Sequence, residues 1–187
     1  MYKSIMLAVA GAFAFTGFGA SSASAQDFVI TSSAFQDGGW LAQKNAGNNP
    51  KNPNCVGQNV SPPLAWQNVP AKATSLALLM FDPEGRGGQG VSHWVSYGIP
   101  VSVTGFAEGE VSKPSEKYVG GLGTQKQSIY LGPCTPPGPL HHYTFTLIAT
   151  THGVKDLAPG LTREEFFEKS QGKLLTATGL VGLWKKK

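Results

Sequence analysis

The sequence predicts a mainly β fold, a sandwich-like packing of sheets with helices appended near the C-terminal end. Three observations support this prediction. Short apolar segments alternate with turn residues, since the chain has 24 Gly and 13 Pro; several of these segments match strand patterns; and only one segment has a good helix signature. There is neither β-α-β alternation nor an internal repeat, which argues against α/β and repeat architectures.

The first 25 residues have the layout of a secretory signal peptide. Lys3 is the only charge before Asp27, an apolar run extends from Ile5 to Phe18, and small residues end in Ala23-Ser24-Ala25. The run of about 14 residues is shorter than the roughly 20 that a membrane-spanning helix needs. We therefore expect cleavage before Gln26 and a periplasmic or secreted mature protein without a membrane span.

The remaining residues, 26–187, number 162 (187 minus 25) and suit a single domain. Loss of Lys3 lowers the formal charge from +4 to +3, and Lys185-Lys186-Lys187 ends the chain. The rest of the domain is close to neutral and has no basic stripe, so nucleic acid is not an expected partner.

Five segments are predicted strands: Phe28–Thr31, Leu76–Phe81, His93–Ile99, Tyr143–Ala149 and Leu180–Trp184. The apolar run 76–81 ends at Asp82-Pro83 and suits a buried central strand, although periodicity alone does not exclude a helix. The segment 143–149 alternates apolar residues with Thr, which is typical of a half-buried strand. Strand aromatics are expected in the core, and Trp94 is expected on the face opposite His93. These aromatics are Trp66, Phe81, Trp94, Tyr97 and Phe145.

Two segments between the strands are predicted to be irregular, and one is predicted to be helical. The polar stretch Gln43–Asn59 reads as a long surface loop, either an interaction surface or a plain insertion. Four prolines exclude Gly132–Pro139 from a helix or a central strand. Leu161–Lys169 is the predicted helix, because Thr162 and the Glu three residues later form a capping box and Gly172 supplies a stop.

The two cysteines, Cys55 and Cys134, are expected to form a disulfide if the protein is exported. Such a bond would contribute about 4 kcal/mol on the chain-entropy model. The alternative is two separate buried thiols, because the sequence does not fix the distance between them.

Three segments, in this order, carry a resemblance to a known family: Asn59-Val60-Ser61-Pro62-Pro63-Leu64-x-Trp66, then Phe81-Asp82-Pro83-Glu84 with His93-Trp94-Val95, then Gly132-Pro133-Cys134-x-Pro136-Pro137-Gly138-x-x-His141-His142-Tyr143. Together they resemble the phosphatidylethanolamine-binding protein family, in its bacterial Raf-kinase-inhibitor-like branch. The resemblance covers about Phe28 to Trp184. It implies a large antiparallel sheet packed on a smaller one, with C-terminal helical segments.

The resemblance also implies a pocket for a small anion such as phosphate, a carboxylate or a phospholipid headgroup. Asp82, His93, His141 and Tyr143 would line it, and Pro133 through Gly138 would form its lip. The histidines would offer ring N–H donors. Asp82 only accepts hydrogen bonds, so we expect it to hold a histidine in one tautomer and raise its pKa; the alternative is that it caps the turn before Pro83.

Two departures from the family pattern occur together. Glu84 replaces the second aspartate of Asp-Pro-Asp, and His142 replaces the arginine of His-Arg-Tyr. A longer acid opposite a shorter base could preserve the reach, so we expect Glu84 and His142 to form a compensated pair. A histidine here would also make the lip sensitive to pH near neutrality.

The predicted function is therefore an anion-binding module that could also modulate or inhibit a partner protein, with neither a cofactor nor enzymatic activity. The alternative is a hydrolase that uses Asp82, His93 and His141, but no Gly-x-Ser-x-Gly motif supplies a nucleophile. A metal site on the histidines is disfavoured, because the H-x-x-x-H and C-x-x-C spacings are absent.

Overall fold

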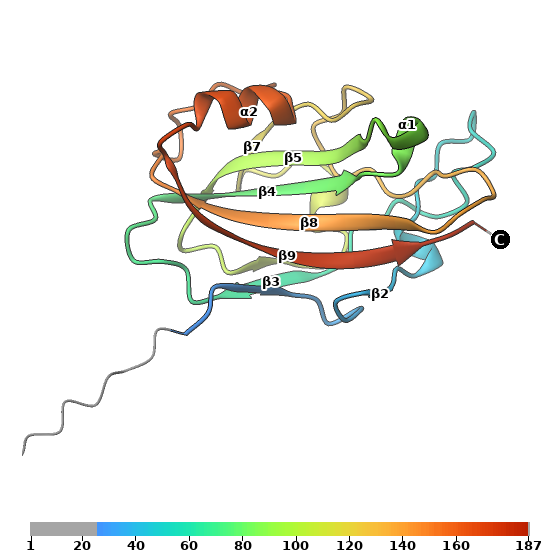
Figure 1. The fold of residues 1–187 in the computed structure, drawn as a ribbon, viewed down its shortest axis with the longest axis horizontal. Helices are drawn as coiled ribbons and strands as arrows, with labels where there is room; N and C mark the ends of the chain where they lie inside the picture. Colours follow the sequence, from blue (N-terminus) through green and yellow to red (C-terminus); the bar gives the residue numbers. More distant parts are fainter. Residues whose placement is uncertain (1–25, 187) are drawn as a thin grey trace, which may run out of the picture.

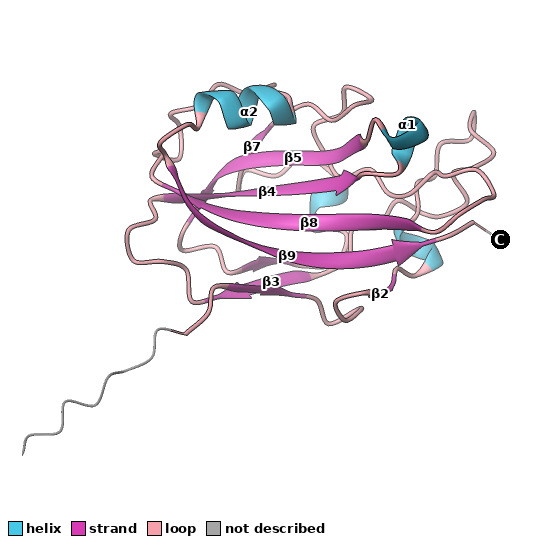
Figure 2. Ribbon diagram, viewed as in Figure 1, coloured by secondary structure: helices cyan, strands magenta, loops and turns pink. Residues whose placement is uncertain are grey.

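Two sheets form the fold in the computed structural model, which describes residues 26–186 (Figures 1 and 2). The large sheet has the order β2-β9-β8-β4-β5-β7 and the small sheet the order β1-β3-β6. The expected mainly β fold with a large and a small sheet is confirmed, and only the edge pair β2–β9 is parallel. The expected signal peptide, residues 1–25, lies outside the described residues.

The elements are, in chain order, β1 (Val29–Thr31), β2 (Gly39–Trp40), the 3-10 turn η1 (Gln43–Asn45), β3 (Leu64–Gln67), β4 (Ser75–Asp82), the short turn α1 (Gly85–Gly88), β5 (Val91–Pro100), β6 (Gly105–Phe106), the 3-10 turn η2 (Glu110–Ser112), β7 (Val119–Gly120), β8 (His141–Thr150), α2 (Arg163–Lys169) and β9 (Leu174–Trp184). None of the described helices is long and apolar enough to cross a membrane.

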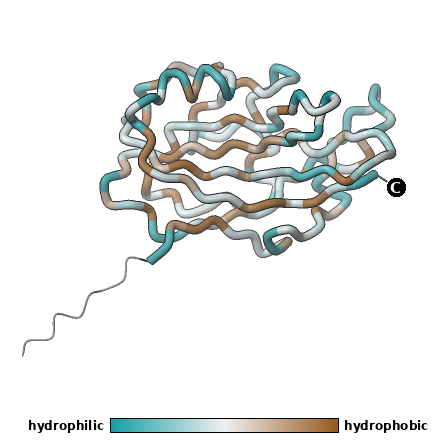
Figure 3. The backbone as a smooth tube through the Cα atoms, in the orientation of Figure 1, coloured by the Kyte–Doolittle hydropathy of each residue, from teal (hydrophilic) through white to brown (hydrophobic). Residues whose placement is uncertain are grey.

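The central strand β4 is buried on both faces, which explains its uninterrupted apolar sequence. Leu76, Leu78 and Met80 contribute to the core between the two sheets. Ala77 and Leu79 point to a second core, beneath α2. Successive side chains of a strand alternate between its faces, so a strand between two cores must be apolar at every position. In Figure 3 much of the hydrophobic colouring lies along the strands.

Helix α2 covers the outer face of the large sheet, and its predicted capping box is present. The Thr162 side chain accepts a hydrogen bond from the Glu165 N–H, and the Glu165 carboxylate accepts one from the Thr162 N–H. Phe166 stacks on Tyr97 of β5 at 5.7 Å between ring centroids. The strand that follows begins at Leu174, six residues before the predicted start at Leu180. Residues 174–177 are exposed, so no burial pattern marks them as a strand.

The prediction that Gln43–Asn59 is a surface loop is wrong for the first part of the segment, which is buried. Asn45 and Ala46 are fully buried, and Asn45 is the last residue of the 3-10 turn η1. Its side chain accepts from the Ala42 N–H and donates to the Val60 carbonyl, at 3.0 and 2.8 Å. Side-chain to backbone hydrogen bonds, rather than apolar periodicity, therefore fold this part of the chain.

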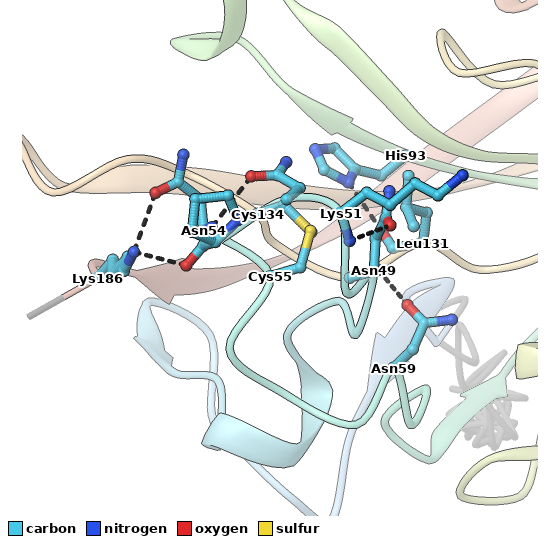
Figure 4. Close-up of a disulfide and its surroundings, with 12 residues drawn as sticks. Asn49, Lys51, Asn54, Cys55, Asn59, His93, Leu131, Cys134 and Lys186 are labelled. Atoms are coloured by element: carbon cyan, nitrogen blue, oxygen red, sulfur yellow. Dashed lines mark hydrogen bonds between the residues drawn. A yellow bond between two sulfur atoms is a disulfide. The ribbon is translucent and has the colours of Figure 1, made fainter.

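The expected disulfide between Cys55 and Cys134 is present (Figure 4). It joins this segment to Gly132–Pro139, the Pro-rich segment. The two segments also share a backbone hydrogen bond of 2.9 Å, from the Gly47 N–H to the Pro133 carbonyl. A Cβ atom at Gly47 would overlap the sulfur of Cys134. Only glycine fits at this position, because the disulfide lies directly against the backbone.

Candidate functional site

A small pocket of about 180 Å³ lies where β4, α1, β5, the start of β8 and the Pro-rich segment meet. Four of the residues predicted for the site line it together: Asp82, His93, His141 and Tyr143. Three of these side chains come from the ends of neighbouring strands, and His93 comes from β5 beside them. The remaining lining residues are Gly85, Arg86, Val91, Gln125, Cys134, Thr135 and Pro136.

Asp82, the last residue of β4, is 2% exposed and uses both carboxylate oxygens. Oδ1 accepts hydrogen bonds from the N–H groups of Glu84 and Gly85, both at 3.0 Å. Oδ2 accepts the Nδ1–H of His141 at 2.8 Å. The turn-capping role and the histidine-holding role were alternatives at the level of sequence, and one side chain performs both.

His93 is held by a β-bulge in β5. Ser92 pairs with Phe81 and Trp94 pairs with Met80, so His93 is the extra residue between them. A bulge re-aims the side chains beside it. Trp94 is buried in the core between the sheets together with Tyr143, and the His93 ring contacts that same Tyr143 at 5.0 Å. The prediction that the side chains of His93 and Trp94 lie on opposite faces of the sheet is therefore wrong, although Trp94 is a core residue as predicted.

Burial determines the protonation of His93. The buried position favours the neutral ring and lowers the pKa of His93, and the nearby Asp82 charge offsets this only in part. Asp82 thus acts on the pKa of His93 in the expected direction, but burial has the larger effect and the net pKa is lowered. The carboxylate oxygen lies 4.0 Å from Nε2 of His93, too far for a hydrogen bond.

The two histidines have their Nδ1–H groups already engaged. His93 donates to the Leu131 carbonyl and His141 donates to Asp82, each at 2.8 Å. A neutral ring that carries its proton on Nδ1 has a lone pair on Nε2. The Nε2 atoms become donors only when the rings are protonated. The donors expected for an anion are therefore conditional on pH.

Two hydroxyl groups of the pocket have no hydrogen-bond partner among the described residues, those of Thr135 and Tyr143. Both residues are buried, and burial together with the Asp82 charge raises the pKa of Tyr143, so its hydroxyl stays protonated. Buried polar groups are normally satisfied by protein, water or ligand. Both hydroxyls belong to residues that line the pocket, but their oxygen atoms are almost fully covered, so a small polar group would reach them only with a local shift of the lining.

The lip of the pocket differs from the prediction. Pro133 is buried and accepts the Gly47 N–H, and Gly138 lies in the exposed part of its loop, so neither lines the pocket. The middle of the predicted stretch, Cys134, Thr135 and Pro136, does line it. Arg86 was also missed; it is an exposed cation at the rim with no ion pair among residues 26–186. The only signal for it was its position two residues after the Asp-Pro-Glu motif.

Glu84 and His142 are in contact at the surface beside this pocket. Glu84 accepts the His142 Nδ1–H at 2.8 Å and the backbone N–H of the same residue at 3.0 Å. Partial burial alone would raise the pKa of Glu84, but these hydrogen bonds outweigh it and lower the pKa. Both side chains are at least one-third exposed, so the pair contributes little to stability.

Asp82, Glu84 and His141 each offer one ligand atom, all within 4.8 Å of one another. Two carboxylates and an imidazole suit a divalent cation. However, Nδ1 of His141 donates to Asp82, so a metal bound through this nitrogen would have to displace its proton. The sequence did not indicate this group, because His141 lies 59 positions after Asp82 in the chain.

A Ser–His–Asp arrangement lies outside the pocket and also escaped the sequence analysis. His152 Nε2 is 3.1 Å from the Ser170 hydroxyl, and its Nδ1 is 4.0 Å from Asp156. Ser170 is fully buried at the end of α2, so a substrate has no access to its hydroxyl. The arrangement supports packing and not nucleophilic attack, because a nucleophile must reach the substrate.

The sequence and the fold are both similar to those of known proteins. The sequence model of the phosphatidylethanolamine-binding protein family matches residues 31–185. The chain belongs to this family. Among its relatives, a UPF0098 protein of Methanothermobacter thermautotrophicus is 37% identical over 134 residues, which cover 71% of this chain and 87% of that protein. LppC of Mycobacterium tuberculosis, which carries the name of a lipoprotein, is 36% identical over 139 residues, 74% of this chain and 62% of that protein.

Two solved structures of phosphatidylethanolamine-binding protein (PEBP) homologues have the same fold. CT736 of Chlamydia trachomatis is 30% identical with a TM-score of 0.72, and the match covers 86% of this chain and 98% of that one. YbcL of Escherichia coli has a TM-score of 0.77 at 23% identity, with coverage of 87% and 100%. The PEBP fold of this chain is thus supported by sequence and by structure.

Proposed function

We propose that the protein is an exported binding module whose pocket takes a small oxyanion: phosphate, a carboxylate, or the phosphate of a phospholipid headgroup or of a partner protein. The observation that carries this proposal is the set of unengaged groups in one small pocket. Thr135 and Tyr143 offer hydroxyl donors, and Arg86 supplies positive charge at the rim.

An oxyanion with one remaining proton suits these groups best. Its free oxygens would accept from the two hydroxyls, and its own O–H would donate to the Nε2 lone pair of His93 or His141. Monohydrogen phosphate and phosphate monoesters in their singly protonated form have this combination. A fully deprotonated carboxylate would need a protonated histidine first.

Binding without turnover is the proposed activity. Within residues 26–186, neither pocket histidine is hydrogen-bonded to a hydroxyl or thiol that could act as a nucleophile. Ser170 is hydrogen-bonded to a histidine, but it is buried elsewhere. Export to the periplasm or to the medium is supported by the disulfide and by a relative that carries the name of a lipoprotein. Modulation of a partner protein would follow from recognition of an anionic group on it.

Isothermal titration with inorganic phosphate at pH 7 tests the proposal. We expect saturable binding to the wild type and a loss of at least about tenfold in His141→Ala, since a variant that leaves buried polar partners unpaired loses ligand binding strongly. His142→Ala is the matched control, because this neighbouring histidine lies outside the pocket lining. Equal affinities of both variants and the wild type would refute the pocket, and turnover of an aryl phosphate or ester that disappears in His93→Ala would favour the hydrolase.

A further inference from the structure

A second and larger cavity, of about 730 Å³, opens at the C-terminal end of β9. We name it the tail groove, after the chain end that borders it. Its lining is mostly apolar and consists of Trp40, Leu41, Val56 and Trp184, with Gln43 beside them. Trp40 is 60% exposed and Val56 is 37% exposed. Ligand sites in proteins have volumes and apolar linings of this kind.

Two cations border the tail groove, Lys185 and Lys186. Neither has a carboxylate partner in the part of the chain that the structure describes. Lys186 is nevertheless fixed in place, because its ammonium group donates to the Pro53 carbonyl at 2.8 Å and to the Asn54 side chain at 2.9 Å (Figure 4). Both acceptors are neutral, so the positive charge of Lys186 is not cancelled.

The polar groups of the tail groove are few and mostly engaged. The Leu41 N–H donates to the Leu183 carbonyl, the Gln43 carbonyl accepts from Ala46, and the Gln43 side-chain amide donates to the Val56 carbonyl. The buried indole N–H of Trp184 has no partner among the described residues. A peptide segment buried here would leave its backbone groups unsatisfied, whereas a hydrocarbon chain needs no such partners.

We infer that the tail groove binds a single-chain amphiphilic anion, an alkyl chain that ends in a carboxylate. The chain would cover Trp40 and Val56, and the carboxylate would lie against Lys185 and Lys186. Charge complementarity and the mostly apolar lining both favour this occupant over a peptide. The site is separate from the anion pocket, because the two linings share no residue.

Titration calorimetry of the purified protein with dodecanoate, below its micelle concentration, tests the inference. We expect one-to-one saturable binding, a loss of about tenfold or more in Trp40→Ala because a large aromatic contact is removed, and a loss of about threefold in Lys186→Gln because only one ion pair is removed. Val56→Ser gives a second, independent variant of the apolar wall. His93→Ala, which changes the other pocket, should bind dodecanoate as the wild type does.

Three results would overturn the inference. The first is no saturable binding of dodecanoate, and the second is affinity that is unchanged in both Trp40→Ala and Val56→Ser. The third is equally tight binding of dodecyltrimethylammonium, which has the same chain length and the opposite charge. Sedimentation of the protein with phosphatidylglycerol vesicles in a Trp40-dependent manner, without binding of free dodecanoate, would assign the tail groove to a membrane surface instead.

Discussion

At the scale of single residues, binding in the anion pocket depends on which ring nitrogen of each histidine carries a proton. The Nδ1–H groups of His93 and His141 are engaged by Leu131 and Asp82, so the neutral rings present lone pairs on Nε2. The positions of Asp82, His93, His141 and Tyr143 could be inferred from sequence by resemblance. Asp82 was expected to hold a histidine in one tautomer, as it does for His141. The direction of the His93 ring proton could not be inferred, since it depends on a carbonyl acceptor 38 positions away.

This arrangement predicts a pH dependence that differs between ligands. Acetate has only acceptor oxygens, so it should bind better as the pH falls and a pocket histidine becomes protonated, by up to about tenfold for each pH unit above the pKa of that ring. Phosphate can supply its own proton and should vary less. Calorimetric titrations between pH 5.5 and 7.5 measure both profiles. Acetate affinity that stays constant over this range would contradict the assigned tautomers.

Arg86 is expected to attract the anion from the rim of the pocket. Arg86→Gln should weaken phosphate binding by about threefold to tenfold at low ionic strength, and added salt should reduce this difference because exposed charges are screened. Lys72→Gln removes an exposed positive charge elsewhere on the surface and serves as the control. If both substitutions lower the affinity equally, net charge and not the position of Arg86 is responsible.

At the scale of elements, the disulfide joins the segment that begins at η1 to the Pro-rich segment that lines the pocket. Cys134 is itself a lining residue, with Thr135 and Pro136 after it. The Asn59 side chain strengthens the same junction by accepting from the Gly132 N–H at 2.8 Å and donating to the Tyr130 carbonyl at 3.1 Å. In the view of Figure 4, His93 and Lys186 lie on opposite sides of the disulfide.

Removal of this cross-link should affect both stability and binding. We expect Cys55→Ser combined with Cys134→Ser to lower the free energy of unfolding by about 4 kcal/mol on the chain-entropy model, for a bond that spans 79 positions. Phosphate affinity should fall as well, because the lip loses an anchor. Urea unfolding and calorimetry measure the two effects. Wild-type protein in reducing agent should reproduce both, and unchanged phosphate affinity would show that the lip is held without the bond.

The elements that sequence patterns revealed are those with a buried face. The strand at 76–81 and the helix at 161–169 were found because apolar residues and a capping box mark them. The first turn of Gln43–Asn59 was missed because polar side chains fold it, and the start of β9 was missed because both its faces are exposed. The β-bulge at His93 could not be predicted, because the sequence of residue types along the strand does not reveal it.

At the scale of the whole molecule, β4 separates two cores and ends at the pocket. Histidines at the edges of these cores are kept neutral by burial, which lowers the pKa of His93 and of His152. The overall layout of sheets and helix was predictable from sequence and resemblance. The tail groove was not, because it assembles residues from β2, the segment after η1 and the chain end, none of which forms a motif.

These two histidines predict how stability depends on pH. In the unfolded chain they take up protons near pH 6.5, whereas in the folded chain they do so only at lower pH. The unfolded state therefore binds more protons as the pH falls below about 6.5, and the free energy of unfolding should decrease there. Urea unfolding at pH 7.5 and 5.5 measures the change, and His93→Gln should reduce it. An increase in stability on acidification would contradict the burial of neutral rings.

The extra residue in β5, His93, is needed for the pocket but not for the sheet, and this has a consequence for related sequences. Without His93, Ser92 and Trp94 would still face Phe81 and Met80, so the sheet would become regular and both cores would persist. We expect a homologue shortened by one position here to fold normally and yet bind oxyanions poorly. A single gap in an alignment would then distinguish such proteins better than their overall identity.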